Sequence, residues 1–140
     1  MSSRKILPEF THSAGSVAIE YGLILPAMLL FTLGIMDAGR LLWTNITLTR
    51  ATEAAARCYA VNSSTCSAGA VPAYAASQAW GINDIAASNF QTSTPACGMQ
   101  VQATYTFQFL VPWFPQFSAA APFGAATMTL NATACYPPQH

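Results

Sequence analysis

Hydrophobic and polar positions divide this chain into regions with different patterns. Residues 17–36 are almost continuously apolar, and Glu20 is the single charged side chain among them. This run of 20 residues has the length, about 20 residues, that an α-helix needs to cross a bilayer. The pattern therefore predicts a membrane-spanning helix close to the N-terminus.

A cleaved secretory signal would also place an apolar run there. Asp37, Gly39 and Arg40 instead lead directly into another helical stretch, without a clear small-residue cleavage site before them. We therefore expect a retained anchor, with Pro26 loosening the helix because proline has no N–H to donate. Gly34 and Ala38 form a small-residue patch where a second helix could pack, or they are ordinary membrane-helix residues.

The helical pattern continues from Asp37 to Arg57, where alanines are frequent. Arg50, Glu53 and Arg57 have the spacing of ion pairs on a helix surface. One helix over residues 17–57 would be about 60 Å long at 1.5 Å per residue. We expect its first half to lie in lipid and its second half to project as a stalk.

The distal part predicts short elements separated by loops. Residues 59–71 are typical of a loop, Pro72 favours a helix start before residues 73–80, and Gly81 would end that helix. A short helical turn is expected near residues 84–88. Residues 99–109 alternate apolar and polar side chains, as in a half-buried strand, and residues 125–136 do so less cleanly. An antiparallel β-ribbon of these two strands would be marginal alone, so it should pack on the helices.

The four cysteines are Cys58, Cys66, Cys97 and Cys135, and their spacing does not fit a zinc site. An even number in a small, membrane-tethered domain favours disulfides formed in an oxidising compartment. Three pairings are open to four cysteines. Pairing nearest neighbours favours Cys58–Cys66 and Cys97–Cys135, and four buried free thiols are the alternative.

The predicted fold class is α+β: a long N-terminal transmembrane helix that extends into a stalk, followed by a small disulfide-clipped domain. That domain holds a short helix and an antiparallel β-ribbon. The divisions are a leader at 1–15, a transmembrane and stalk helix at 16–57, and a periplasmic domain at 58–140.

Composition narrows the possible functions. Hydrophobic residues make up 53% of the 140 residues and charged residues 7%, with no net charge. A protein without a basic excess has no electrostatic footprint for nucleic acid. No nucleotide-binding, zinc-protease or nucleophile-elbow motif occurs, and the few acids and histidines cannot assemble an acid/base pair. We therefore expect no enzyme, no cofactor and no metal site.

An apolar segment connects the two predicted strands. It contains Trp113 and Phe114 between Pro112 and Pro115, and Phe117 two residues after the second proline. Such a segment could form a patch that faces a partner or a membrane. It could equally fold back onto the small core.

The N-terminal motif points to a family. Gly15 is followed by Val-Ala-Ile-Glu-Tyr, then by Leu25-Pro26, by the Gly-x-x-Asp-x-Gly-Arg element that starts at Gly34, and by the alanine run before Arg57. About a third of the chain thereby resembles the TadE family, the pseudopilins of the tight-adherence (Flp) pilus system. The later cysteines and strands resemble that family more weakly.

The resemblance implies a minor, membrane-anchored assembly component of the pilus. A prepilin peptidase would cut between Gly15 and Ser16. The expected partners are this peptidase, other pilins or pseudopilins, inner-membrane assembly proteins and the lipid bilayer. The protein would cross the bacterial inner membrane once, with its C-terminal domain in the periplasm, and could enter a surface pilus.

Glu20, with its neighbour Tyr21, is the candidate assembly residue. After cleavage the new amino group of Ser16 would lie one helical turn from this carboxylate. A carboxylate costs about 2.5–3.5 kcal/mol at mid-membrane, so pairing with an amine of its own or a neighbouring subunit would offset that cost. An acid that snorkels to the interface without a partner is the alternative.

A second function also fits the residues. The chain could be a single-pass anchored periplasmic module, for binding or as a scaffold, that is neither processed nor polymerised. Such a module would keep residues 1–15.

Overall fold

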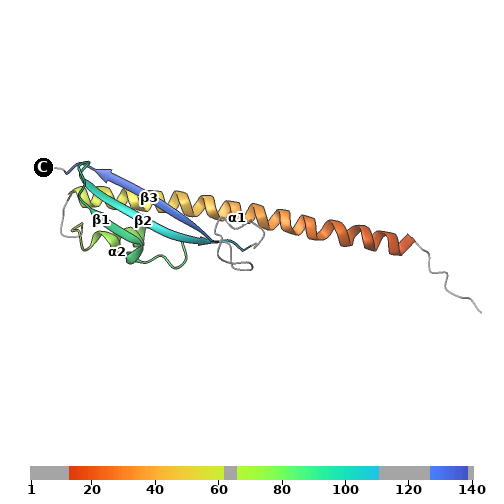
Figure 1. Cartoon of the computed structure of the whole chain (residues 1–140). Coiled ribbons are helices and arrows are strands. Elements are labelled where there is room, and N and C mark those ends of the chain that lie inside the picture. The colour runs from red at the N-terminus through yellow and green to blue at the C-terminus, as the bar shows by residue number, and fades with distance from the viewer. Residues whose placement is uncertain (1–12, 62–65, 111–126, 139–140) are drawn as a thin grey trace, which may run out of the picture.

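The computed structural model describes residues 13–61, 66–110 and 127–138. A single long helix, α1 (Ser13–Val61), extends well beyond the rest of the molecule at its N-terminal end (Figure 1). The remaining elements lie along its C-terminal half: α2 (Val71–Gln78), the 3-10 turn η1 (Ala87–Asn89), β1 (Phe90–Ser93), β2 (Met99–Gln108) and β3 (Thr127–Tyr136). The α+β class predicted from the sequence is confirmed.

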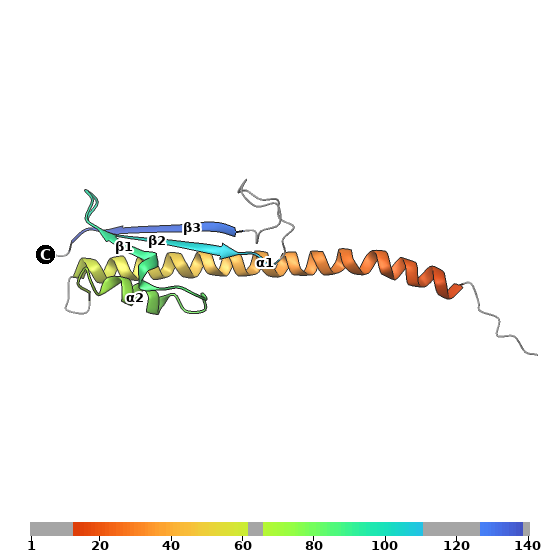
Figure 2. The ribbon, with the colours of Figure 1, turned by 60° about the horizontal axis from the view of Figure 1, so that its bottom comes forward.

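Helix α1 has two halves with different surroundings. Between Val17 and Met36 its large apolar side chains are exposed, whereas from Asp37 onward a stripe at three- and four-residue spacing is buried. Figure 2 shows the sheet along one side of this second half. The part that the sequence analysis describes as a stalk is therefore also the central element of the distal domain.

The helix is longer than the predicted 17–57 and continues through Pro26. Its last turn extends to Val61 because Tyr59 and Ala60 are buried against the domain. The predicted exposed side is correct: Arg50, Glu53 and Arg57 all lie on it.

Three antiparallel strands form the sheet, in the order β1-β2-β3. The predicted alternation of β2 is confirmed, because Val101, Ala103 and Phe107 are buried and Tyr105 is half-buried. The side chains on the other face are exposed: Gln102, Thr104 and Thr106. In β3, Leu130 and Ala132 are buried, but Met128 on the same side is 48% exposed at the beginning of the strand.

The predicted two-stranded ribbon omits strand β1. Residues 90–93 pair with residues 100–103 of β2, and Phe90 is buried. Four residues are too few to show an alternating pattern, so only the pairing with β2 identifies this strand.

Two short helical elements differ in position from the prediction. Helix α2 begins at Val71 and ends at Gln78, so Trp80 lies outside it, in the turn before Gly81. The turn expected near residues 84–88 is a 3-10 helix at Ala87–Asn89, and Asp84 precedes it with a φ of 58°. Tertiary contacts of Trp80 and of Asn83, described below, account for both differences.

The core lies between α1, α2 and the inner face of the sheet, and most of its side chains are small. The fully or almost fully buried members include Leu48, Ala51, Ala55, Ala56, Val71, Ala75, Val101 and Ala103. Burial of a CH₂ group contributes about 0.8 kcal/mol, so alanines contribute little each. Covalent crosslinks therefore add stability that such a core does not supply by burial alone.

Two disulfides supply those crosslinks. Cys58 at the end of α1 is bonded to Cys66, and Cys97 is bonded to Cys135 near the end of β3. These are the two pairs that the sequence analysis favours. Gly98 beside the second disulfide has a φ of 120°, and a Cβ there would overlap the carbonyl of Tyr136, so this close approach requires glycine.

We predict that the two disulfides contribute unequally to stability. The Cys97–Cys135 bond spans 38 residues and the Cys58–Cys66 bond spans 8. Loop-closure entropy then gives about 4 kcal/mol for the first and about 2.5 kcal/mol for the second. The measurement is urea unfolding of the full chain in detergent micelles, followed by near-ultraviolet circular dichroism, for the two double Cys→Ser variants. A larger loss for the Cys58/Cys66 variant would contradict this order.

Candidate functional site

The carboxylate of Asp37 joins helix α1 to the end of strand β2. Its side chain is completely buried, its Oδ1 accepts a hydrogen bond of 3.0 Å from Nη1 of Arg40, and its Oδ2 accepts one of 2.9 Å from the backbone N–H of Leu110. Buried charges need partners of this kind, because an unpaired one is strongly disfavoured. Asp37 therefore fixes where the sheet begins to cover the helix.

Arg40 has a second contact beyond this ion pair. Its guanidinium carbon lies 5.3 Å from the centroid of the Phe107 ring, a distance typical of cation–π attraction. Its side chain remains 45% exposed. Arg40 thus packs on the sheet and still presents part of its guanidinium to the surroundings.

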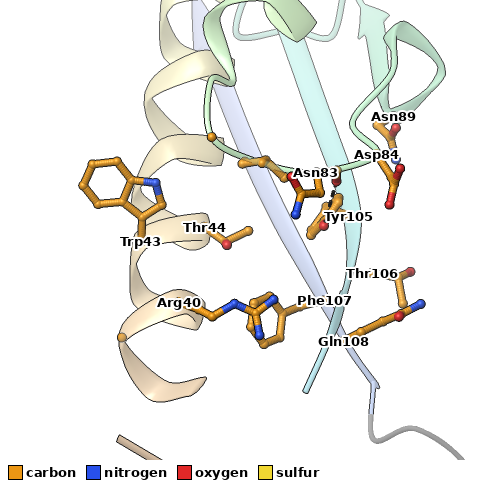
Figure 3. Close-up of a pocket in the computed structure, with 13 residues that line it drawn as sticks. Arg40, Trp43, Thr44, Asn83, Asp84, Asn89, Tyr105, Thr106, Phe107 and Gln108 are labelled. Carbon is orange, nitrogen blue, oxygen red and sulfur yellow. Dashed lines mark hydrogen bonds between the residues drawn. The ribbon is translucent and has the colours of Figure 1, made fainter. Parts of the chain in front are cut away.

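A cavity of about 520 Å³ opens next to Arg40 (Figure 3). Helix α1 contributes Arg40 and Trp43, the turn after α2 contributes Asn83 and Asp84, and β2 contributes its last residues. The further polar lining residues are Thr44, Asn89, Thr106 and Gln108. The cavity thus combines one cation and one anion with neutral amide and hydroxyl groups.

Two tryptophans meet at the edge of this cavity. The rings of Trp43 and Trp80 are in edge-to-face contact, with centroids 5.4 Å apart. They nevertheless remain 49% and 68% exposed. This contact explains why Trp80 leaves helix α2, and the positive φ of Gly81 allows the turn beside the Trp43 ring.

Asp84 is held in the same turn by the local backbone. Its φ of 58° is uncommon for a residue other than glycine, although aspartate tolerates it better than most. The neighbouring carbonyl of Asn83 accepts a hydrogen bond of 2.9 Å from the Tyr105 hydroxyl of β2. The turn is thereby anchored to the sheet, and Asp84 lies on the cavity lining.

The opposite end of α1 has a different polar contact. Nε of Arg57 donates a hydrogen bond of 2.8 Å to the Tyr136 hydroxyl, and its guanidinium lies 5.2 Å from that ring. The hydrogen bond to Tyr136 raises the pKa of Arg57. Among the described residues, Arg57 is thus bonded to Tyr136, and the expected pairs with Glu53 are not within 4.0 Å.

The other predicted site residues lie apart from this cavity. Gly15 and Ser16 are in the first turns of α1, and Glu20 and Tyr21 are exposed on the bare half of the helix. Among the described residues, nothing lies within 4 Å of a Cβ placed on Gly34. Trp113, Phe114 and Phe117 lie outside the described residues.

Chemistry within the described residues is limited. No group of three His, Cys, Asp or Glu side chains among them could hold a metal ion. All four cysteines form the two disulfides. The arrangement around Arg40 and Asp84 is suited to binding a polar group rather than to covalent chemistry.

The N-terminal helix is long and apolar enough to cross a membrane, by length and composition. Residues 15–57 match the family model of TadE-like proteins. No curated protein and no solved structure matches the chain. The TadE-like segment begins at Gly15 and contains Asp37, Arg40 and Trp43, so it covers the α1 side of the site but not the sheet.

The match and the apolar helix together indicate a membrane-anchored protein associated with a tight-adherence pilus. Sequence reasoning placed Asp37 and Arg40 in a TadE-like element but did not connect them to Leu110 or to the cavity. The signal in the sequence that could have identified Asp37 is its place as an acid directly after a long apolar run.

We predict that Asp37→Ala loosens the junction between α1 and β2. The amide of Leu110 loses its acceptor, whereas the half-exposed Arg40 is rehydrated, so the local cost is about 2 kcal/mol. Hydrogen exchange of the Leu110 amide in the membrane-reconstituted chain should then accelerate about 30-fold, at about 1.4 kcal/mol per factor of ten. Glu53→Gln, which changes an exposed acid of the same helix outside this contact and outside the cavity, serves as the control. An unchanged exchange rate in Asp37→Ala would show that the Asp37 contact does not hold the strand.

Proposed function

We propose that this chain is a TadE-like pseudopilin, a membrane-anchored structural component in the assembly of a tight-adherence pilus. The TadE-like match over residues 15–57 carries this proposal. The match begins at Gly15, after which a prepilin peptidase would cleave the leader. The mature protein would comprise the helix from Ser16 and the distal domain that begins at Cys58.

The bare half of α1 supports an assembly role. Large side chains from Val17 to Met36 are exposed, and none of the elements that the structure describes in the distal domain covers them. In a bilayer these side chains contact lipid, and in an assembly they contact the helices of neighbouring subunits. The Gly34 and Ala38 patch allows a neighbouring helix to approach closely.

The distal domain supports a periplasmic location. Both disulfides lie in this domain or at the end of α1 that it covers, and disulfides persist in oxidising compartments. The anchor then crosses the inner membrane once, with residues 1–15 on the cytoplasmic side. The partners are the prepilin peptidase, other pilins or pseudopilins, and inner-membrane assembly proteins.

Processing is the most direct test of the proposal. We expect protein recovered from its native membrane to begin at Ser16 when the prepilin peptidase is present, and at Met1 when the peptidase is deleted. Gly15→Val should keep the leader attached, because a branched side chain at the cleavage site obstructs the protease. The measurement is mass spectrometry of the N-terminal peptide.

Gly22→Val is the matched control for this experiment. It makes the same chemical change in the same helix, and a Cβ at Gly22 has nothing within 4 Å to meet. This variant should still begin at Ser16. An intact leader in the wild-type chain would instead favour an anchored periplasmic module that is neither processed nor polymerised.

Glu20 carries the proposed assembly contact. Pairing of its carboxylate with the amine of Ser16, in the same or a neighbouring subunit, offsets the cost of a charge near the membrane. We expect Glu20→Ala to be processed normally but to lower the amount of the protein in sheared pilus fractions, or the number of pili, about tenfold, which corresponds to about 1.4 kcal/mol. Glu53→Gln, an exposed acid on the same helix, is the control. Normal assembly with Glu20→Ala would rule out this role for Glu20.

A further inference from the structure

The cavity beside Arg40 lies at the end of the distal domain from which the bare helix extends. Side chains of α1 are exposed up to Met36, and the domain covers the helix from Asp37 onward. At 1.5 Å per residue, Arg40 is about 6 Å and Trp43 about 10 Å beyond Met36 along the helix. The polar headgroup layer extends about 5–7 Å beyond the hydrocarbon core on each side. With residues 17–36 in the bilayer, Arg40 is at headgroup depth.

The tryptophans at the cavity edge lie farther out than Arg40, on the water side of this headgroup layer. Trp43 and Trp80 come from different elements, contact each other, and remain about half and two-thirds exposed. Tryptophan is enriched where a membrane meets water, since its ring is apolar and its N–H is polar. A membrane interface is therefore the environment that suits both exposed rings.

The charged groups of the cavity suggest which part of a lipid enters it. A guanidinium has five N–H donors and pairs well with phosphate oxygens. Arg40 uses Nη1 to contact Asp37, and its other donors remain available among the described residues. Asp84 lines the same cavity, and it is the one residue among Asp, Glu, Lys and Arg that follows Arg57 in the chain. Figure 3 shows these two side chains coming from separate elements, with amide side chains also lining the space.

We propose that this cavity binds the headgroup of a zwitterionic phospholipid, phosphatidylethanolamine, from the leaflet next to the domain. The phosphate lies against Arg40 and the ammonium group against Asp84. The amides of Asn83 and Gln108 supply further hydrogen bonds, and the lipid glycerol lies on the bilayer side of Arg40, toward Met36. The volume of about 520 Å³ is within the usual range of ligand pockets, about 300–1,000 Å³.

This inference depends on the membrane anchoring of α1 and not on the pilus role. A bound headgroup would hold the domain at a fixed height and tilt above the bilayer. It would also have to be released whenever the subunit leaves the membrane. A chain that is cleaved normally after Gly15 can therefore still fail to bind the lipid. A chain that keeps its leader can equally bind it.

Lipid binding by the full chain in mild detergent tests the proposal. Phosphatidylethanolamine and phosphatidylglycerol with identical acyl chains are titrated separately, and the bound fraction is measured by native mass spectrometry. We expect the wild-type chain to bind phosphatidylethanolamine about tenfold more tightly than phosphatidylglycerol. Arg40→Gln should weaken the binding of both lipids at least about tenfold, since both carry the phosphate.

Asp84→Asn separates the two parts of the proposal. Asp84 is exposed and makes no contact that the core requires, so this variant should keep its fold and lose only the preference for phosphatidylethanolamine. Arg50→Gln, an exposed arginine on the same helix outside the cavity, should bind both lipids like the wild-type chain. Near-ultraviolet circular dichroism checks that Arg40→Gln retains the packed domain.

Three outcomes would overturn the proposal. The first is equal affinity of the wild-type chain, Arg40→Gln and Asp84→Asn for both lipids. The second is a wild-type preference for phosphatidylglycerol, which would remove the role of Asp84. The third is binding of soluble phosphoethanolamine as tight as that of the lipid, which would show a site for a soluble ligand rather than for the membrane.

Discussion

The close approach of the sheet to one face of α1 is the contact on which the rest of the distal domain depends. On the helix this face consists mostly of alanine and threonine, with Leu48 as its largest fully buried side chain. Opposite lie Val101, Ala103 and Ala132, which are also small. Small residues bring the backbones close together, and the hydroxyl of the buried Thr52 is satisfied by the Leu48 carbonyl at 2.7 Å. Because this interface buries few large side chains, the disulfides contribute part of the free energy of unfolding of the domain.

Asp37 lies where the surroundings of helix α1 change. Before it the large apolar side chains of the helix are exposed, and after it the sheet covers one side. A buried carboxylate at this boundary would be unfavourable without Arg40 and the Leu110 amide, which together compensate it. The same ion pair positions Arg40 at the cavity, so the junction between anchor and domain and the candidate lipid site share one residue.

The outer face of the sheet shows how a domain with so few charges stays polar. Glutamine, threonine and asparagine side chains occupy the exposed positions of β2 and β3, and Thr104 donates to Asn131 across the strands at 3.2 Å. Neutral side chains of this kind hydrate the surface without creating long-range repulsion. Crowded copies of such a domain could therefore lie close together in an assembly.

The sequence by itself determined the apolar anchor, the long helix, strands β2 and β3, the favoured disulfide pairs and the TadE-like segment. Each of these follows from a local pattern: a run of apolar residues, an alternation, or a motif with fixed spacing. Only the tertiary structure decided three other features. These are strand β1, the position of Trp80 outside α2, and the cavity lined by Arg40 and Asp84. Each of those depends on a partner far away in the chain, such as Ala103 for Phe90 or Trp43 for Trp80. Residues 90–93 and the turn around Asp84 have no local preference strong enough to indicate their structure, so their conformation follows from the surfaces that they contact.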